Sequence, residues 1–149
     1  MGKYFKNITD DLKKFILDQK MFVVGTAPDT EEEVYISPKG YDTLKIIDTN
    51  KVIYFDYLDS DSENETVRHL KENGKITLMW CGFDSKPRIL RAYGNGKVIS
   101  KGTDDFNILL NQYFSGYDEK MVKQLFEIQI EKLMTTCGFG VPIMKCEKD

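Results

Sequence analysis

The sequence has few residues that could build a metal site or a disulfide framework. It contains three cysteines, Cys81, Cys137 and Cys146, and one histidine, His69. No two cysteines form a CxxC pair, and an odd, scattered set is typical of proteins in a reducing cytoplasm. We therefore expect no metal site, no disulfide and a cytoplasmic location.

Long apolar runs and basic clusters are also absent. No uninterrupted apolar run approaches the roughly 20 residues of a membrane span, and the opening segment has no apolar stretch of the kind found in a secretory signal. The net charge is -3, and no run of five basic residues occurs. The sequence thus gives no electrostatic basis for binding nucleic acid and no segment for entering a membrane.

What is present is the composition of one folded domain. The chain has 149 residues, of which 41% are hydrophobic and 30% are charged. This length favours a single domain with one core over residues 1–149.

Three helices are indicated by apolar spacing and by capping residues. Thr9 is expected to cap an opening helix whose apolar residues recur at three- and four-residue spacing. A short helix around residues 67–70 is expected to end at Asn73-Gly74, a typical C-terminal stop. Thr103 is expected to cap the last helix.

Six or seven short strands are indicated by alternating or β-branched runs. The Gly94-Asn95-Gly96 segment predicts a hairpin turn between two of them. Most connections are too short for a helical crossover, so we expect an antiparallel sheet that closes into a small barrel, a mainly β fold with flanking helices. Eight candidate segments, of which six or seven are expected to form the strands of the sheet, cover residues 21–27, 33–37, 44–47, 51–57, 75–83, 88–93, 96–101 and 126–131.

The acidic segment DSDSENETVRHL (59–70) allows three interpretations. It does not fit a calcium-binding EF-hand loop, because Asn64 stands where glycine is required and Leu70 where glutamate is required. Ser62 and Glu65 fit a capping box, although Asn64 could cap instead. Either cap leaves a helix N-terminus that could bind an anion or could simply begin a helix.

A phosphate at this helix start would need compensating positive charge, because the segment is acidic. Candidate cations are Lys39, Arg68, Arg88 and Arg91. Arg88 and Arg91 lie three residues apart in a predicted strand, so their side chains should point to opposite faces. At most one of these two arginines can face a given ligand.

Four segments match one known family in order and spacing. They are VYISPKG (34–40), the strand-loop-helix segment 51–80, PRILRAYGNGKVI (87–99) and CGFGVP (137–142). Together they resemble the pyridoxamine phosphate oxidase-like family of flavin-binding split barrels. The resemblance implies a six-stranded antiparallel split barrel, a homodimer, and flavin mononucleotide (FMN) in a cleft between the subunits.

The resemblance also implies where a cofactor would lie. The strand end at 37–39 would run along the flavin, the loop-helix junction would hold the phosphate with help from an arginine, and the late CGF segment would fold over the partner's ring edge. Two aromatic residues are candidates for a position near the ring. The implied cofactor-binding residues are Ser37, Pro38, Lys39, Tyr57, Ser62, Asn64, Thr66, Trp80, Arg88, Arg91, Cys137, Gly138 and Phe139.

Two departures from the family argue against pyridoxamine phosphate oxidase activity. Asn64, Glu65 and Thr66 stand where true oxidases carry a basic Ser-Arg-Lys, and the chain ends in IMKCEKD without an Arg-rich segment. Three hypotheses stand: an FMN-dependent oxidoreductase acting on a small molecule, a non-enzymatic flavin-binding or stress-related redox-sensing dimer, and a member that binds a deazaflavin or no flavin.

No catalytic acid or base is identified from the sequence. His69 is expected to be a structural residue inside a helix. Cys81 lies in an apolar strand and is expected to belong to the core, whereas Cys137 lies beside a glycine and is the better candidate for a reactive thiol.

Overall fold

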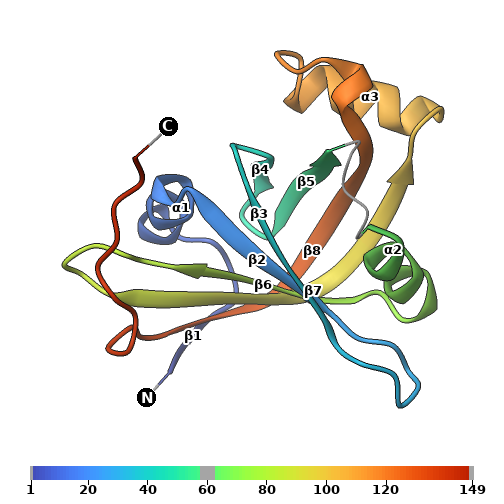
Figure 1. Cartoon of the computed structure of the whole chain (residues 1–149). Coiled ribbons are helices and arrows are strands. Elements are labelled where there is room, and N and C mark those ends of the chain that lie inside the picture. The colour runs from blue at the N-terminus through green and yellow to red at the C-terminus, as the bar shows by residue number, and fades with distance from the viewer. Residues whose placement is uncertain (1, 58–62, 148–149) are drawn as a thin grey trace.

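One antiparallel sheet that curls on itself forms the body of the molecule (Figure 1). The structure is a computed structural model, and it describes residues 2–57 and 63–147, with only the backbone of residues 63 and 64. The strands are β1 (Lys3–Phe5), β2 (Met21–Thr26), β3 (Tyr35–Gly40), β4 (Leu44–Asp48), β5 (Lys51–Tyr57), β6 (Lys75–Cys81), β7 (Arg88–Ser100) and β8 (Val122–Cys137). The helices are α1 (Asp10–Asp18), α2 (Glu63–Glu72) and α3 (Asp104–Tyr113), with a short 3-10 turn at Glu119–Met121.

The sheet is a split barrel, as predicted. Its strand order is β3-β2-β6-β7-β8-β5-β4, with β1 paired to β8 at the side. Every pairing within it is antiparallel. The main path therefore has seven strands rather than six, and β3 and β4 lie at its two open ends.

The three predicted helices are confirmed, as are the caps at Thr9 and Thr103. Thr9 Oγ1 accepts a hydrogen bond from the Leu12 amide at 3.2 Å, and Thr103 Oγ1 accepts one from the Phe106 amide at 3.2 Å. Helix α2 stops just before Gly74, whose φ of 73° is the left-handed conformation that favours glycine. These local signals were readable because each depends on residues close in sequence.

Two apolar clusters hold the sheet to its helices. The inner cluster fills the curl of the barrel and includes Leu12 and Ile16 of α1, Leu70 of α2 and Trp80 of β6. The second cluster lies under α3, on the opposite face of β5 and β8. Because side chains alternate along a strand, the same strands β5 and β8 supply both clusters.

The predicted hairpin at Gly94–Gly96 is wrong. Residues 88–100 form one continuous strand, β7, which pairs with β8 over its whole length. The register shifts between Tyr93 and Gly94, and a Cβ built on Gly94 would lie 2.1 Å from the Gln129 carbonyl oxygen. The glycine therefore serves a close approach of two backbones at a bend, not a turn.

Replacing Gly94 with alanine should destabilise the protein strongly. The added methyl group would collide with the backbone of β8, so β7 or β8 would have to move, and we expect a loss of about 2–3 kcal/mol in the free energy of unfolding. Urea denaturation of Gly94→Ala measures this loss. Gly116→Ala is the control, because a Cβ there meets nothing within 4 Å; equal stability of the two variants would contradict the close approach.

None of the helices in the described part of the chain has the length and apolar character that crossing a membrane requires.

Candidate functional site

Six strands place one residue each in a row across the outer face of the sheet, the face turned away from the inner cluster. Cross-strand pairing places these residues side by side, and we call them the outer row: Pro38, Val23, Met79, Arg91, Met134 and Tyr4. The residues next to four of them in sequence, Val24, Leu78, Leu90 and Leu133, are buried in the inner cluster. Because side chains alternate along a strand, the side chains of the outer row point away from that cluster.

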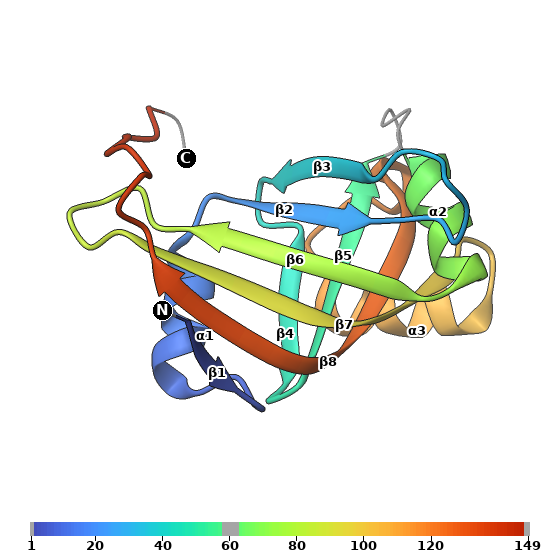
Figure 2. The ribbon, with the colours of Figure 1, turned by 90° about the horizontal axis from the view of Figure 1, so that it is seen from below.

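The outer row has no helix packed on it in the described part of the chain. Helices α1 and α2 contribute to the inner cluster, and α3 covers the other end of β7 and β8. Figure 2 views the molecule with β2, β6, β7 and β8 across the front, and no helix crosses the middle of these strands. Tyr4 is 62% exposed, and Ile36, which flanks the row on β3, is 67% exposed. This sheet face is therefore apolar and open.

Arg91 is the one charged residue of the outer row. Its guanidinium donates to Thr136 Oγ1 at 3.1 Å, and no carboxylate of the described residues forms an ion pair with it. A half-buried cation between Met79 and Met134, with a hydroxyl as its one hydrogen-bond partner among the described residues, is well placed to attract an anionic group.

Arg88 points to the opposite face, as the spacing predicts. Its guanidinium lies 2.8 Å from Asp11 Oδ2 and 4.4 Å from the centre of the Phe15 ring. Its charge is therefore already matched by α1. Of the two arginines, only Arg91 faces the outer row.

The strand end at 37–39 divides its side chains between two faces. Pro38 faces outward, whereas Ser37 is buried and Lys39 is largely buried, both on the inner side. Lys39 Nζ lies 2.5 Å from Asp56 Oδ1, and the Asp56 side chain is only 1% exposed. These three residues therefore cannot all contact one ligand with their side chains.

Asp56 is the residue that sequence reasoning missed. It stands inside KVIYFDY, where every other residue after the first is apolar or aromatic. A buried carboxylate requires a partner, so an acid in a buried strand was itself the signal for a lysine nearby. Burial and the neighbouring Asp56 carboxylate raise the pKa of Tyr54 well above its usual value.

The loop-helix junction can be described only in part. Ser62 lies outside the described residues, as does the side chain of Asn64. Thr66 is buried, and His69 is fully buried with Nδ1 2.9 Å from Thr26 Oγ1. The expectation that His69 is structural agrees with this contact between α2 and β2.

The β2–β3 loop is tied to α2 by polar contacts. Arg68 bridges Glu32 and Glu65 at 2.9 and 2.7 Å, and the Asn73 side chain donates to the Ala27 carbonyl at 2.8 Å. Because Arg68 already neutralises two carboxylates, its charge is not available to a phosphate. The start of α2 therefore has backbone amides but no uncommitted arginine of its own.

The remaining predicted site residues lie in three separate places: Trp80 on β6, Tyr57 on β5, and the segment 137–139 at the end of β8. Trp80 is buried on the inner face beside Phe22, and the Tyr57 ring packs edge-on against Phe55 at 5.2 Å. Phe139 is 92% exposed in the segment after β8, while Cys137 is exposed and Gly138 is packed against Pro87. Phe139 is thus an apolar side chain without a covering surface within the described chain.

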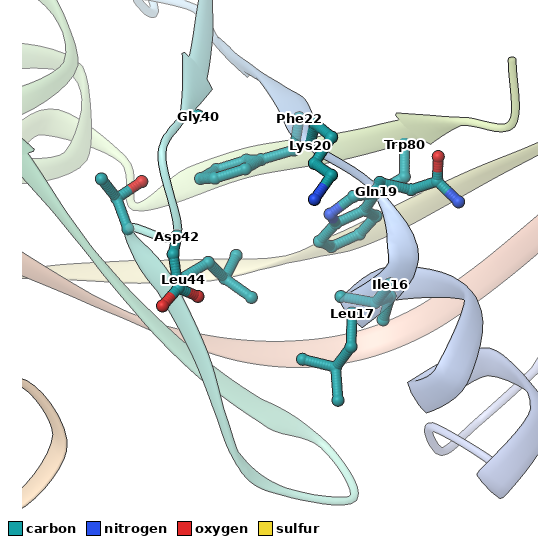
Figure 3. Close-up of a pocket in the computed structure, with 10 residues that line it drawn as sticks. Ile16, Leu17, Gln19, Lys20, Phe22, Gly40, Asp42, Leu44 and Trp80 are labelled. Carbon is teal, nitrogen blue, oxygen red and sulfur yellow. The ribbon is translucent and has the colours of Figure 1, made fainter. Parts of the chain in front are cut away.

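A small pocket opens between α1 and the β3–β4 turn (Figure 3). Phe22, Leu44 and Trp80 line it, with Lys20 and Asp42 at its polar side. Its volume is about 40 Å³, far below the roughly 300–1,000 Å³ of sites that enclose a drug-sized ligand. This pocket cannot enclose a flavin. Among the described residues, no group of histidines, cysteines and carboxylates could hold a metal ion.

The three thiols should differ in reactivity. Burial raises the pKa of the Cys81 thiol, and the nearby Arg91 opposes this only in part, whereas Cys137 and Cys146 are exposed. A raised pKa leaves less thiolate at pH 8, and the thiolate is the reactive form. We expect Ellman's reagent to modify two thiols rapidly and Cys81 slowly. In Cys81→Ser the slow phase should vanish; a fast Cys81 would contradict this environment.

The sequence of the chain matches the family described as pyridoxamine 5'-phosphate oxidase over residues 8–137. It is 34% identical over 158 aligned positions to the pyridoxamine 5'-phosphate oxidase family protein ustO of Aspergillus flavus. The alignment covers 100% of this chain and 59% of that protein, so the chain spans about three fifths of the relative's length. The chain belongs to the pyridoxamine 5'-phosphate oxidase family.

Solved structures show the same fold at low sequence identity. HupZ of Group A Streptococcus superposes with a TM-score of 0.65 at 21% identity, covering 85% of this chain and 91% of HupZ. An FMN-binding protein of Syntrophomonas wolfei superposes with a TM-score of 0.56 at 18% identity, covering 82% and 80%. At these identities the two likenesses establish the split barrel alone.

Proposed function

We propose that the chain binds FMN between two copies of itself and acts as an oxidoreductase on a small molecule. The observation that carries this proposal is the outer row, an uncovered apolar surface with Arg91 at its centre. Family membership and the FMN-binding protein of Syntrophomonas wolfei support the choice of cofactor.

A flavin fits this surface only if a second copy covers it. The pocket beside Phe22 and Trp80 is too small to enclose a flavin. The outer row offers an apolar strip for a ring, and Arg91 offers one charge for the phosphate or for the reduced ring. A second copy placed against the row would exclude water and bury Tyr4 and Ile36, both largely exposed in the single chain.

When bound, FMN would supply the hydride or electron transfer. The residues of this chain would position it: Pro38 and Val23 pack against the ring, Arg91 holds negative charge, and the amides at the start of α2 bind phosphate. Phe139 of one copy would cover the ring edge held by the other. The exposed thiols fit a reducing, cytoplasmic location.

A flavin-binding dimer without turnover is the second candidate. Arg91 and Tyr4 are the ionisable side chains of the outer row, and neither is a usual general acid or base near neutral pH. Stopped-flow mixing with reduced nicotinamide under anaerobic conditions separates the two. Bleaching of the flavin band followed by reoxidation with an added acceptor supports an oxidoreductase, and an unchanged band supports a binding protein.

The cofactor itself is tested by purification. The proposal predicts a yellow dimer that releases FMN, identified by mass, in a ratio of one per subunit. Release of a deazaflavin would show that the cofactor is a deazaflavin rather than FMN. A colourless protein that takes up neither molecule would contradict the proposal.

A further inference from the structure

The strands of the uncovered sheet face carry no acidic residue. The whole chain has more acids than bases, 24 against 21. Even so, neither aspartate nor glutamate occurs in the strand segments that build the face of the outer row (Figure 2), which are residues 3–5, 21–26, 35–40, 75–81, 88–93 and 132–137. Any charge that these segments present to solvent is therefore positive.

The cations on the inner side of these strands are matched by carboxylates from elsewhere. Lys39 forms an ion pair with Asp56 of β5, and Arg88 forms one with Asp11 of α1. The elements packed on the inner side thus supply the negative charge that the strands themselves lack.

Three cations on the outer side have no such match, and we call Lys75, Arg91 and Lys132 the outer cations. Lys75 and Lys132 precede Ile76 and Leu133, which are buried in the inner cluster, so alternation turns both lysines outward. No ion pair among the described residues includes any of the outer cations. The positive charge of this face is therefore not balanced by an ion pair in the described subunit.

Aromatic rings hold one of the outer cations over the sheet. Lys132 Nζ lies 5.6 Å from the centre of the Tyr4 ring and 5.3 Å from the centre of the Tyr93 ring. Contacts of this kind orient an ammonium group without neutralising it. Glu131, the acid next to Lys132 in sequence, is the extra residue of β8 at the register shift opposite Tyr93, and no ion pair among the described residues joins it to Lys132.

A second copy does not bring the missing negative charge through the same surface. Two subunits related by a two-fold axis present the same patch to each other. Whatever the rotation between the two faces, the outer cations of one subunit meet strands without carboxylates. Burying a cation without a counter-charge is unfavourable, and like charges brought close together repel.

The apolar area of the same face favours association. Tyr4 and Ile36 are 62% and 67% exposed, and a second copy would remove both from water. Dimerisation therefore has a favourable apolar contribution and an unfavourable electrostatic one. An anion bound between the two faces removes the second, and a phosphate monoester such as FMN carries about 1.5 to 2 negative charges at pH 7.

We propose that FMN controls dimerisation: without it the outer cations keep two subunits apart, and bound FMN supplies the counter-charge that allows the two faces to associate. This inference rests on the function proposed above and adds a form of regulation to the same site. Because coupling between two binding events is reciprocal, FMN strengthens the dimer by the same factor by which the dimer strengthens FMN binding.

Sedimentation velocity of the flavin-free protein tests the proposal. A concentration series gives the dissociation constant of the dimer for the protein alone, with FMN and with riboflavin, which has the same ring system but no phosphate. We expect FMN to lower this constant by at least about tenfold, and riboflavin to lower it much less. Equal effects of the two flavins would overturn the proposal, because the ring rather than the charge would then drive association.

Neutralising the outer cations should strengthen the flavin-free dimer. The double variant Arg91→Gln with Lys132→Gln removes unpaired charge, so it should dimerise more tightly than the wild type without any flavin. Lys13→Gln is the control, because Lys13 is exposed on α1, which packs on the inner side of the sheet. A double variant that dimerises no more tightly than Lys13→Gln would overturn the proposal, as would a weaker dimer in Glu131→Gln, which would identify Glu131 as the counter-charge.

The same experiment separates this inference from the proposed function. Absorbance at the flavin band shows whether FMN sediments with the protein. FMN that sediments with the protein but leaves the dissociation constant of the dimer unchanged overturns the inference and leaves the proposed cofactor in place. FMN that does not sediment with the protein overturns both.

Discussion

Arg91→Gln should weaken FMN binding about 10- to 100-fold, while Arg88→Gln should leave it nearly unchanged. A hydrogen bond to a charged group contributes about 1.5–3 kcal/mol, which corresponds to roughly one to two powers of ten in the dissociation constant. Arg91 faces the uncovered outer row, and Arg88 faces Asp11 on the other side of the sheet. Isothermal titration of FMN into the wild type and both variants measures the difference.

The matched pair makes this test specific. Both substitutions remove one positive charge from β7, three residues apart, so a general effect of net charge would weaken both equally. Equal FMN affinities for the wild type and Arg91→Gln would show that Arg91 does not contact the cofactor. A larger loss of affinity in Arg88→Gln than in Arg91→Gln would show that the cofactor binds on the inner side of the sheet.

Asp56→Ala should reduce the free energy of unfolding by about 3–5 kcal/mol. The substitution leaves the Lys39 ammonium largely buried without its carboxylate, and breaking a buried ion pair from one side has a cost of this order. The two side chains are 11% and 1% exposed, so solvent screens them little. Urea denaturation monitored by fluorescence of Trp80 measures the loss.

The control for Asp56 is an ion pair on the surface. Lys14 and Asp18 lie 2.9 Å apart on α1 with side chains 77% and 58% exposed, and such pairs contribute little to stability. Lys14→Met should leave the unfolding curve in place. A similar shift for Asp56→Ala and Lys14→Met would contradict the view that Lys39–Asp56 is a buried ion pair on which the folded state depends.

Much of the fold could be predicted because its signals are local. The caps Thr9 and Thr103 and the stop before Gly74 act through neighbouring residues, and alternation in 126–131 revealed the strand that became β8. The hairpin turn predicted at Gly94–Gly96 is wrong because glycines suit both a turn and a close approach between two strands. The sequence near this segment does not distinguish these two structures, because the distinction depends on the pairing of β7 with the distant strand β8.

The candidate site was less accessible to sequence reasoning. Spacing alone separated Arg88 from Arg91, yet it did not show which one faces the uncovered side. The outer row combines residues from six strands, and no sequence pattern links Tyr4 to Pro38. Asp56 was missed because an ion pair with Lys39 depends on two strands that form no ladder with each other.

Native mass spectrometry of the freshly purified protein tests the central claim most directly, because one spectrum reports both subunit number and bound cofactor. The account predicts the mass of two chains with two FMN molecules, and loss of the flavin when Arg91 is replaced by glutamine. A single chain without flavin, or a dimer that takes up no FMN when the cofactor is added in excess, would contradict it.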